Sequence, residues 1–201
     1  SDGTEANTAL VKDIQPGPSW STLGNFVILG GQLLFSADDG VHGIELWRSD
    51  GTPGGTEMVK DIHPSGSSSI DYLTVAGTTL FFAADDGVHG YEIWKSNGTE
   101  ATTEMVEDIH PTDGSSPDYL NAVGSTLFFV ADDGASGPEL WKSNGSAAGT
   151  SMVEELVAGP DGISEIYDAA PLGSLLVFSL VLGDGDVELW KSDGTGAGTP
   201  P

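Results

Sequence analysis

The stretch ELWRSDGTPGGTEMVKDI, residues 45–62, decides the fold because close copies of it return at a nearly fixed spacing. The tripeptide Glu-Leu-Trp or Glu-Ile-Trp ends at four tryptophans that lie 47, 47 and 49 residues apart, Trp47, Trp94, Trp141 and Trp190. Each tryptophan is followed by Ser-Asp-Gly-Thr or a near copy of it. A period of this length indicates one supersecondary unit copied along the chain. Four similar units favour binding over catalysis by a single asymmetric site.

The second copy shows what one unit contains. Four runs of four to six residues are rich in β-forming side chains, and each is stopped by Gly, Asn, Asp or Pro: 72–75, 79–83, 91–94 and 104–109. No window of this copy has the apolar period of a helix. The pattern therefore predicts four short antiparallel strands, which is typical of one β-propeller blade. Trp and Phe-Phe are expected to fill the space between blades, and the Asn-Gly and Asp-Gly pairs to form the tight turns.

The whole chain, 1–201, is predicted to form one all-β domain, a β-propeller of four four-stranded blades. The repeats run over about 15–62, 63–109, 110–157 and 158–199. Residues 9–14 match 57–62, so the segment 8–14 is expected to complete the last blade as its closing strand and remove two open sheet edges. Two alternatives stay open: the same ends pair between molecules as a head-to-tail homo-oligomer, or the chain is a segment of a larger propeller.

Charge narrows the classes of partner. The 201 residues carry 31 acids and 6 bases, a formal net charge of −25. Nucleic acid and anionic membrane surfaces would be repelled, and no apolar run is long enough to insert into a bilayer. The absence of cysteine excludes disulfides and thiolate metal sites. Self-repulsion at this charge predicts that cations stabilise the fold, as in calcium-rich extracellular fluid or the cytoplasm of a halophile.

Paired aspartates are the candidate metal ligands. The pairs stand in equivalent turns of the first three copies, each before a Gly: Asp38 and Asp39, Asp85 and Asp86, Asp132 and Asp133. Ca²⁺ takes six to eight oxygen ligands, so a pair followed by Glu45, Glu92 or Glu139 could supply part of a site. The alternative is that the aspartates only accept turn hydrogen bonds. The fourth copy has Leu-Val-Leu-Gly at 180–183 in this place.

Other candidate chemistry is weaker. Trp20 stands outside the repeat register in a Pro- and Ser-rich loop, where it would suit stacking on a sugar, anchoring a partner or plugging the ring. The histidines come in repeat-related pairs, without the convergence that zinc requires. No nucleophile elbow, phosphate-binding loop or His-Glu-x-x-His motif is present. A glycosidase or lyase would use the acids peculiar to the fourth copy, which are Asp161, Glu165, Asp168 and Asp184.

Residues 45–62 resemble the ELWxxDGT repeat of large bacterial secreted and surface proteins, and the resemblance covers nearly the whole chain in about four copies. It implies a β-propeller-like fold and an extracellular or cell-surface setting, but no particular activity. Together with the acid excess, it leads us to expect a calcium-stabilised, non-catalytic module that binds a glycan or a surface protein in adhesion.

Overall fold

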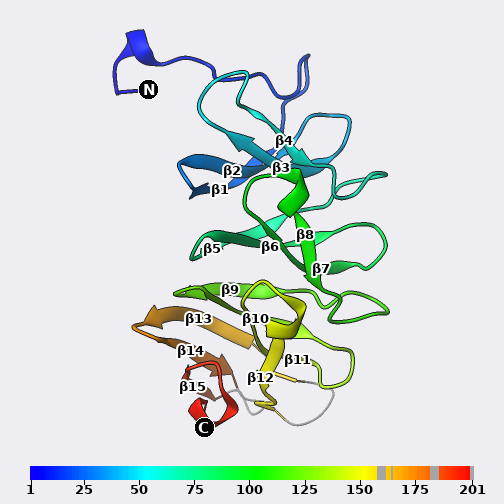
Figure 1. The fold of residues 1–201 in the computed structure, drawn as a ribbon, viewed down its shortest axis with the longest axis vertical. Helices are drawn as coiled ribbons and strands as arrows, with labels where there is room; N and C mark the ends of the chain where they lie inside the picture. Colours follow the sequence, from blue (N-terminus) through cyan, green and yellow to red (C-terminus); the bar gives the residue numbers. More distant parts are fainter. Residues whose placement is uncertain (158–161, 164, 182–185, 200–201) are drawn as a thin grey trace.

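The computed structural model describes residues 1–157, 162–163, 165–181 and 186–199, and they form an all-β fold (Figure 1). Its strands are β1 (Leu23–Leu29), β2 (Gln32–Asp38), β3 (Ile44–Ser49), β4 (Glu57–Lys60), β5 (Asp71–Ala76), β6 (Thr79–Asp85), β7 (Tyr91–Ser96), β8 (Glu104–Glu107), β9 (Asp118–Val123), β10 (Thr126–Asp132), β11 (Pro138–Ser143), β12 (Ser151–Glu154), β13 (Glu165–Leu172), β14 (Leu175–Val181) and β15 (Val187–Ser192). The helical elements in these ranges are 3₁₀ turns, η1 (Glu5–Asn7), η2 (Glu100–Thr102), η3 (Ala147–Gly149) and η4 (Gly196–Gly198). Accordingly, no helix in the described residues is long and apolar enough to cross a membrane.

The strands form four antiparallel sheets that follow one another along the chain. Each sheet is a meander of consecutive strands, β1-β2-β3-β4, β5-β6-β7-β8, β9-β10-β11-β12 and β13-β14-β15. Figure 1 shows the sheets stacked along the long axis of the molecule, and the first strands of neighbouring sheets contact one another. We call the sheets the first to fourth blades. The strands predicted in the second copy are confirmed, within three residues at each end.

Tight turns join the strands where the sequence places Asp or Asn before Gly. In the first blade, Asp50 Oδ1 accepts hydrogen bonds from the backbone N and the Oγ1 of Thr52, at 2.9 and 2.7 Å. Gly51 has a φ of +86°, a conformation that costs glycine little. The oxygens of Ser49 and Thr56 close the base of the loop at 2.6 Å. The expectation that these pairs form turns with positive φ is confirmed.

The core lies between the blades. Phe81 and Phe82 are fully buried on opposite faces of β6, so the first contacts the third blade and the second contacts the first blade. Trp94, which is 6% exposed, packs in the same cluster as Phe82. The second blade is thus stabilised on both faces by its neighbours, because burial of large apolar side chains is the main favourable term in folding. The predicted role of Trp and Phe between blades is confirmed.

The expected closure of the ring is not found. Residues 8–14 are not a strand, and the fourth blade has three strands in its described part, so the prediction of four complete blades is wrong for this structure. The N-terminus and the C-terminus lie at opposite ends of the stack (Figure 1). The N-terminal segment packs on the first blade, where Ile14 contacts the cluster of Phe35, Ala37 and Trp47. A strand needs a partner edge, and the open edge of β15 lies at the far end of the molecule.

Candidate functional site

The paired aspartates serve as turn formers. Asp38 Oδ1 accepts a hydrogen bond from the backbone N of Gly40 at 2.7 Å, and Asp39 Oδ1 accepts from the backbone N of Val41 and of His42 at 2.9 Å each. Asp85 with Asp86, and Asp132 with Asp133, make the same contacts in the next two blades. Burial opposes ionisation of Asp39, but the hydrogen bonds from His42 and Val41 outweigh it and lower the pKa of this carboxyl.

The described residues do not place a third carboxylate ligand beside these pairs. In the described part of the chain, no group of three or more His, Asp or Glu side chains is arranged to hold a metal ion. Each pair lies in the β2–β3 turn, or its repeat equivalent, of a separate blade. The glutamates expected to help, Glu45, Glu92 and Glu139, are fully buried and hydrogen-bonded elsewhere. The calcium site therefore stays a prediction.

These buried glutamates have a structural role that the sequence did not reveal. Glu92 accepts hydrogen bonds from the backbone N of Ile109, His110 and Ser115, at 3.3, 3.2 and 2.9 Å, and from Ser115 Oγ at 2.6 Å. Glu45 accepts from the equivalent positions of the preceding connection, 62, 63 and 68. Each carboxylate therefore fixes the connection that leaves its own blade for the next one. The Glu of the Glu-Leu-Trp or Glu-Ile-Trp tripeptide recurs in each repeat, and this recurrence is the sequence signal that could have indicated its structural role.

Burial raises the pKa of all three glutamates, against the opposing effect of the hydrogen bonds they accept. The pKa of Glu139 rises to about 7. Leu156 and Val157 donate to Glu139 through their backbone N atoms at 2.9 and 3.3 Å. A carboxyl that titrates near neutrality but is held by backbone donors inside the fold makes stability depend on pH.

Trp20 is 91% exposed in the loop before β1, so it does not plug the stack. His42 and His89 each contact the aspartate three residues before them, at 2.8 Å between Nδ1 and Oδ2. Of the acids peculiar to the fourth repeat, Asp161 and Asp184 lie outside the described residues, as does the side chain of Glu165. Asp168 is exposed and lies in β13.

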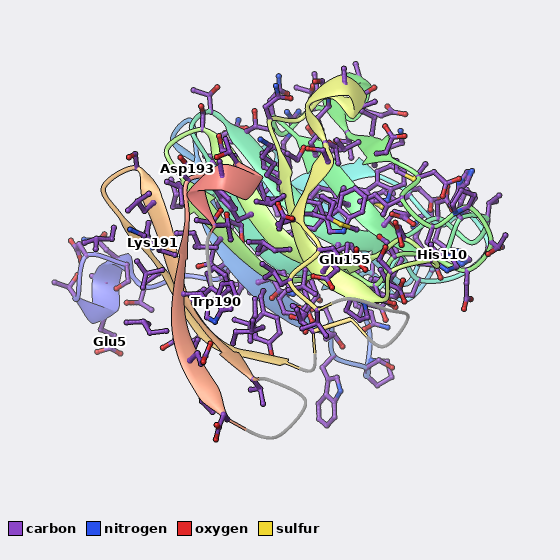
Figure 2. All side chains as sticks on the ribbon, turned by 90° about the horizontal axis from the view of Figure 1, so that it is seen from below. Glu5, His110, Glu155, Trp190, Lys191 and Asp193 are labelled. Carbon is purple, nitrogen blue, oxygen red and sulfur yellow. The ribbon has the colours of Figure 1, made fainter. Side chains whose placement is uncertain are left out.

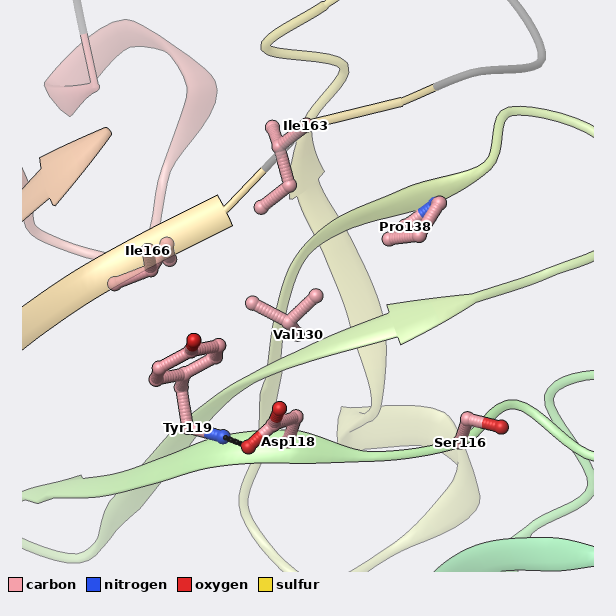
Figure 3. Close-up of a pocket in the computed structure, with 7 residues that line it drawn as sticks. All are labelled: Ser116, Asp118, Tyr119, Val130, Pro138, Ile163 and Ile166. Carbon is pink, nitrogen blue, oxygen red and sulfur yellow. Dashed lines mark hydrogen bonds between the residues drawn. The ribbon is translucent and has the colours of Figure 1, made fainter. Parts of the chain in front are cut away.

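A pocket of about 320 Å³ lies between the third and fourth blades (Figure 3). Its polar lining comes from the start of β9 and the residue two positions before it, and its apolar lining from β10, β11, β13 and the segment before β13. The lining residues are Ser116, Asp118, Tyr119, Val130, Pro138, Ile163 and Ile166. The connection before β13 is fixed by the backbone N of Ile163, which donates to the carbonyl of Pro138 at 2.8 Å. Sequence reasoning missed this pocket, because its two sides belong to different repeats.

The polar side of the pocket is held in place by the backbone. Asp118 Oδ1 accepts a hydrogen bond from the backbone N of Tyr119 at 2.6 Å (Figure 3). Tyr119 has a φ of +51°, as Tyr72 and Asn25 have at the equivalent positions of the earlier blades, at +56° and +55°. Burial and then the negative charge of Asp118 raise the pKa of Tyr72 to about 12, so a tyrosine of the second blade also faces this carboxylate. The arrangement offers a carboxylate acceptor and an aromatic ring above an apolar floor.

Comparison with known proteins gives the fold and no family. No family model matches the sequence, and no curated protein matches it. Similar solved structures include a crystal structure of puromycin hydrolase, with a TM-score of 0.59 and 15% identity over 90% of this chain and 29% of that one. The structure of its S511A mutant complexed with PGG has a TM-score of 0.57 and 16% identity over 87% of this chain and 29% of that one. A puromycin-hydrolyzing peptidase of Mycobacterium tuberculosis has a TM-score of 0.58 and 12% identity over 89% of this chain and 28% of that one.

The chain spans less than a third of the length of these proteins, so the likeness shows a shared fold in part of them. Their hydrolase chemistry is not carried to this chain by identities of 12–16%.

Proposed function

We propose that the chain is a non-catalytic binding module of the cell surface or the extracellular medium, which recognises one sugar unit of a glycan in the pocket between the third and fourth blades. The single observation that carries this is the lining of the pocket. Asp118 and Ser116 supply hydrogen-bonding oxygens, Tyr119 supplies a ring, and aliphatic side chains supply the floor. A volume of about 320 Å³ is at the small end of the range for ligand sites.

The same lining supports binding without catalysis. Hydrolysis of a glycosidic bond requires two carboxyl groups that face one bond. Among the described side chains that line the pocket, Asp118 alone carries a carboxylate. The abundant acids elsewhere form turns, as Asp39 does, or fix connections, as Glu92 does. The exposed Trp20 offers a second contact to the glycan or to the surface protein that bears it.

The test is titration of the protein with the sugars that a glycan array selects. Asp118→Asn should weaken binding about tenfold or more, because a charge-assisted hydrogen bond to a sugar hydroxyl is lost. Asp71→Asn is the matched control: Asp71 holds the equivalent position in the second blade, where its Oδ1 accepts from the backbone N of Tyr72 at 2.9 Å. No hit on the array, or equal losses in the two variants, would reject the pocket as the site.

Calcium stabilisation is a second part of the proposal, and it rests on the charge of −25 and the three aspartate pairs. A ligand that binds only the folded state raises the melting temperature with its concentration. We expect Ca²⁺ to raise it more than Mg²⁺ at matched ionic strength, and Asp85→Asn combined with Asp86→Asn to reduce the difference. Equal rises with both ions would mean general screening of the carboxylates.

A further inference from the structure

The outer face of the fourth blade exposes apolar side chains, one of them at a position that is buried in every other blade. Leu46, Ile93 and Leu140 are at most 1% exposed, because the following blade covers them. Their equivalent in the fourth blade, Leu189, is 80% exposed, and Leu172 on the same face is 66% exposed. A shallow groove of about 210 Å³ runs along this face, with Ala170, Val177 and Leu189 in its lining. We call this surface the trailing face.

The first blade has the opposite surface uncovered. Phe26 and Ile28 on β1 are 59% and 64% exposed, whereas their equivalents in the second blade, Leu73 and Val75, pack against the first blade. The ring of Phe26 stacks on Phe35 at 5.6 Å, so these side chains form one apolar surface with the buried cluster around Trp47. We call this surface the leading face. Between neighbouring blades inside the molecule, the face equivalent to the trailing face of one blade covers the face equivalent to the leading face of the next blade.

The segment 9–15 already lies where the outer strand of a preceding blade would lie. Lys12 Nζ donates to the carbonyl of Thr56 at 2.6 Å and lies 6.0 Å from the centre of the Trp47 ring. Lys60, at the end of β4, makes the same two contacts one blade later, 2.8 Å to the carbonyl of Thr103 and 6.0 Å to Trp94. Leu10 is 79% exposed, and no strand of the described blades pairs with its segment. The segment is thus placed as an outer strand without a sheet, whereas β15 is an edge without an outer strand.

The basic side chains show the same match between the two ends of the molecule. Arg48 Nη1 donates to the carbonyl of Gly98 at 3.0 Å, Lys95 Nζ to that of Gly145 at 2.6 Å, and Lys142 Nζ to that of Gly194. Each bond joins β3, or its equivalent, to the Ser-x-Gly turn of the next blade. Lys191 is the equivalent cation of the fourth blade and is exposed on β15, which Figure 2 shows from the trailing end. Gly51 is the equivalent acceptor of the first blade, and it is also exposed.

We propose that the trailing face of one copy binds the leading face of a second copy, with residues 9–12 of the second copy completing the fourth blade of the first. The register of β3 with β4 pairs Trp47 with Met58 and Arg48 with Glu57. The same register places Leu10 opposite Trp190 and Ala9 opposite Lys191. Lys191 then donates to the carbonyl of Gly51 in the second copy. This heterologous contact leaves one face open at each end, so copies add head to tail.

Two features set the conditions of assembly. Each copy carries a charge of −25, so long-range repulsion opposes assembly at low salt and is screened near 0.15 M. Residues 1–8 form an exposed turn that repeats the one at 192–199, and the oxygens of Ser1 and Thr8 close it at 2.7 Å. Since its side-chain hydrogen bonds are internal, this turn can lie outside the joint without loss of contacts.

Mixing of two end variants tests the proposal independently of any pocket ligand. The wild type should show a mass that rises with concentration above 20.7 kDa in light scattering on a sizing column. Leu189→Arg and Ile28→Arg should each be monomeric, and their equimolar mixture should give a dimer, because each retains the face that the other has lost. Val88→Arg is the matched control, since Val88 is equally exposed at 80% but lies in the β6–β7 turn. A monomeric wild type, or no dimer in the mixture, would overturn the proposal.

A cross-link tests the register, and the absence of cysteine makes the result clean. A chain with both Ala9→Cys and Lys191→Cys should form a ladder of disulfide-linked oligomers on mild oxidation. Ala9→Cys with Val88→Cys should not. A disulfide within one chain, seen as a faster-migrating monomer, would instead show that the molecule closes on itself and would overturn the contact between copies.

Discussion

The second and fourth blades use the same Glu-Ile/Leu-Trp tripeptide for different purposes. In the second blade, Glu92 is fully buried and holds three backbone N–H groups of the connection that follows β8. In the fourth blade, Glu188 is exposed and accepts a hydrogen bond from its own neighbour, Trp190 Nε1, at 3.1 Å. The residue types are equal, and the difference is the outer strand and connection that follow β7 in the second blade and that the described part of the fourth blade does not contain.

This contrast shows that the repeat is completed by its neighbours. A blade supplies the carboxylate, the apolar face and the cation. The carboxylate binds the connection that leads to the next blade, and the apolar face and the cation contact the next blade itself. An identical substitution should therefore have a large effect in the second blade and a small one in the fourth, provided that the protein is monomeric during the measurement.

Loss of the buried carboxylate should give the largest difference in stability between the second and fourth blades. Glu92→Ala leaves the backbone N of Ile109, His110 and Ser115 without their acceptor inside the fold, which should cost about 4 kcal/mol of unfolding free energy. Glu188→Ala is the matched control and should cost about 0.5 kcal/mol or less. Urea denaturation of both variants measures this, and similar losses would show that the carboxylate does not fix the connection.

Removal of the buried aliphatic side chain should have the next largest effect. Ile93 is fully buried between the second and third blades, so Ile93→Ala should cost about 3 kcal/mol through lost burial and the cavity left behind. Leu189→Ala, at the equivalent and exposed position, should cost little in dilute solution. Denaturation at low and high protein concentration distinguishes the two cases. A large loss for Leu189→Ala at low concentration would mean that the trailing face is already covered within one molecule.

The buried glutamates also predict the pH dependence. A pKa raised to about 7 for Glu139, and raised for Glu45 and Glu92, means that the folded state holds more protons than the unfolded state above a pH of about 4.5. The contribution of Glu139 to stability is complete below that value and is lost as the pH rises to about 7, and the contributions of Glu45 and Glu92 are also lost as the pH rises. The melting temperature should therefore be about 5 °C higher at pH 5 than at pH 8.

The histidines act in the same direction, because the hydrogen bond that its ring donates to Asp39 raises the pKa of His42, and the bond donated to Asp86 does the same for His89. The lowered pKa of Asp39 and Asp86 has no effect in this window, since both groups stay ionised above a pH of about 5. Thermal scans of wild type and of Glu188→Gln should show the same slope between pH 5 and pH 8. A melting temperature that is flat or rises with pH would contradict the assignment to the buried glutamates.

The sequence predicted local structure well because strand and turn signals lie within a few residues. The Phe-Phe pair, the Asp-Asp-Gly turn and the Ser-Asp-Gly-Thr turn each act inside one hairpin. Closure could not be predicted in the same way. The Val-Lys-Asp-Ile segment at 11–14 looks like an outer strand, but pairing with β15 depends on the curvature of the whole stack. The pocket beside Tyr119 was missed because its other wall comes from the divergent fourth repeat.

The smallest predicted effect concerns the cation that joins each blade to the next turn. Lys95 Nζ donates to the carbonyl of Gly145 at 2.6 Å and lies 3.0 Å from Glu104 Oε1. Because the side chains of Lys95 and Glu104 both reach solvent, Lys95→Met should cost only about 1 kcal/mol of unfolding free energy. Lys191→Met should leave the monomer unchanged but weaken association between copies about fivefold, through loss of the donor to Gly51. Equal melting temperatures for the two variants would mean that the joint between blades depends on apolar contact alone, with the cations only covering its rim.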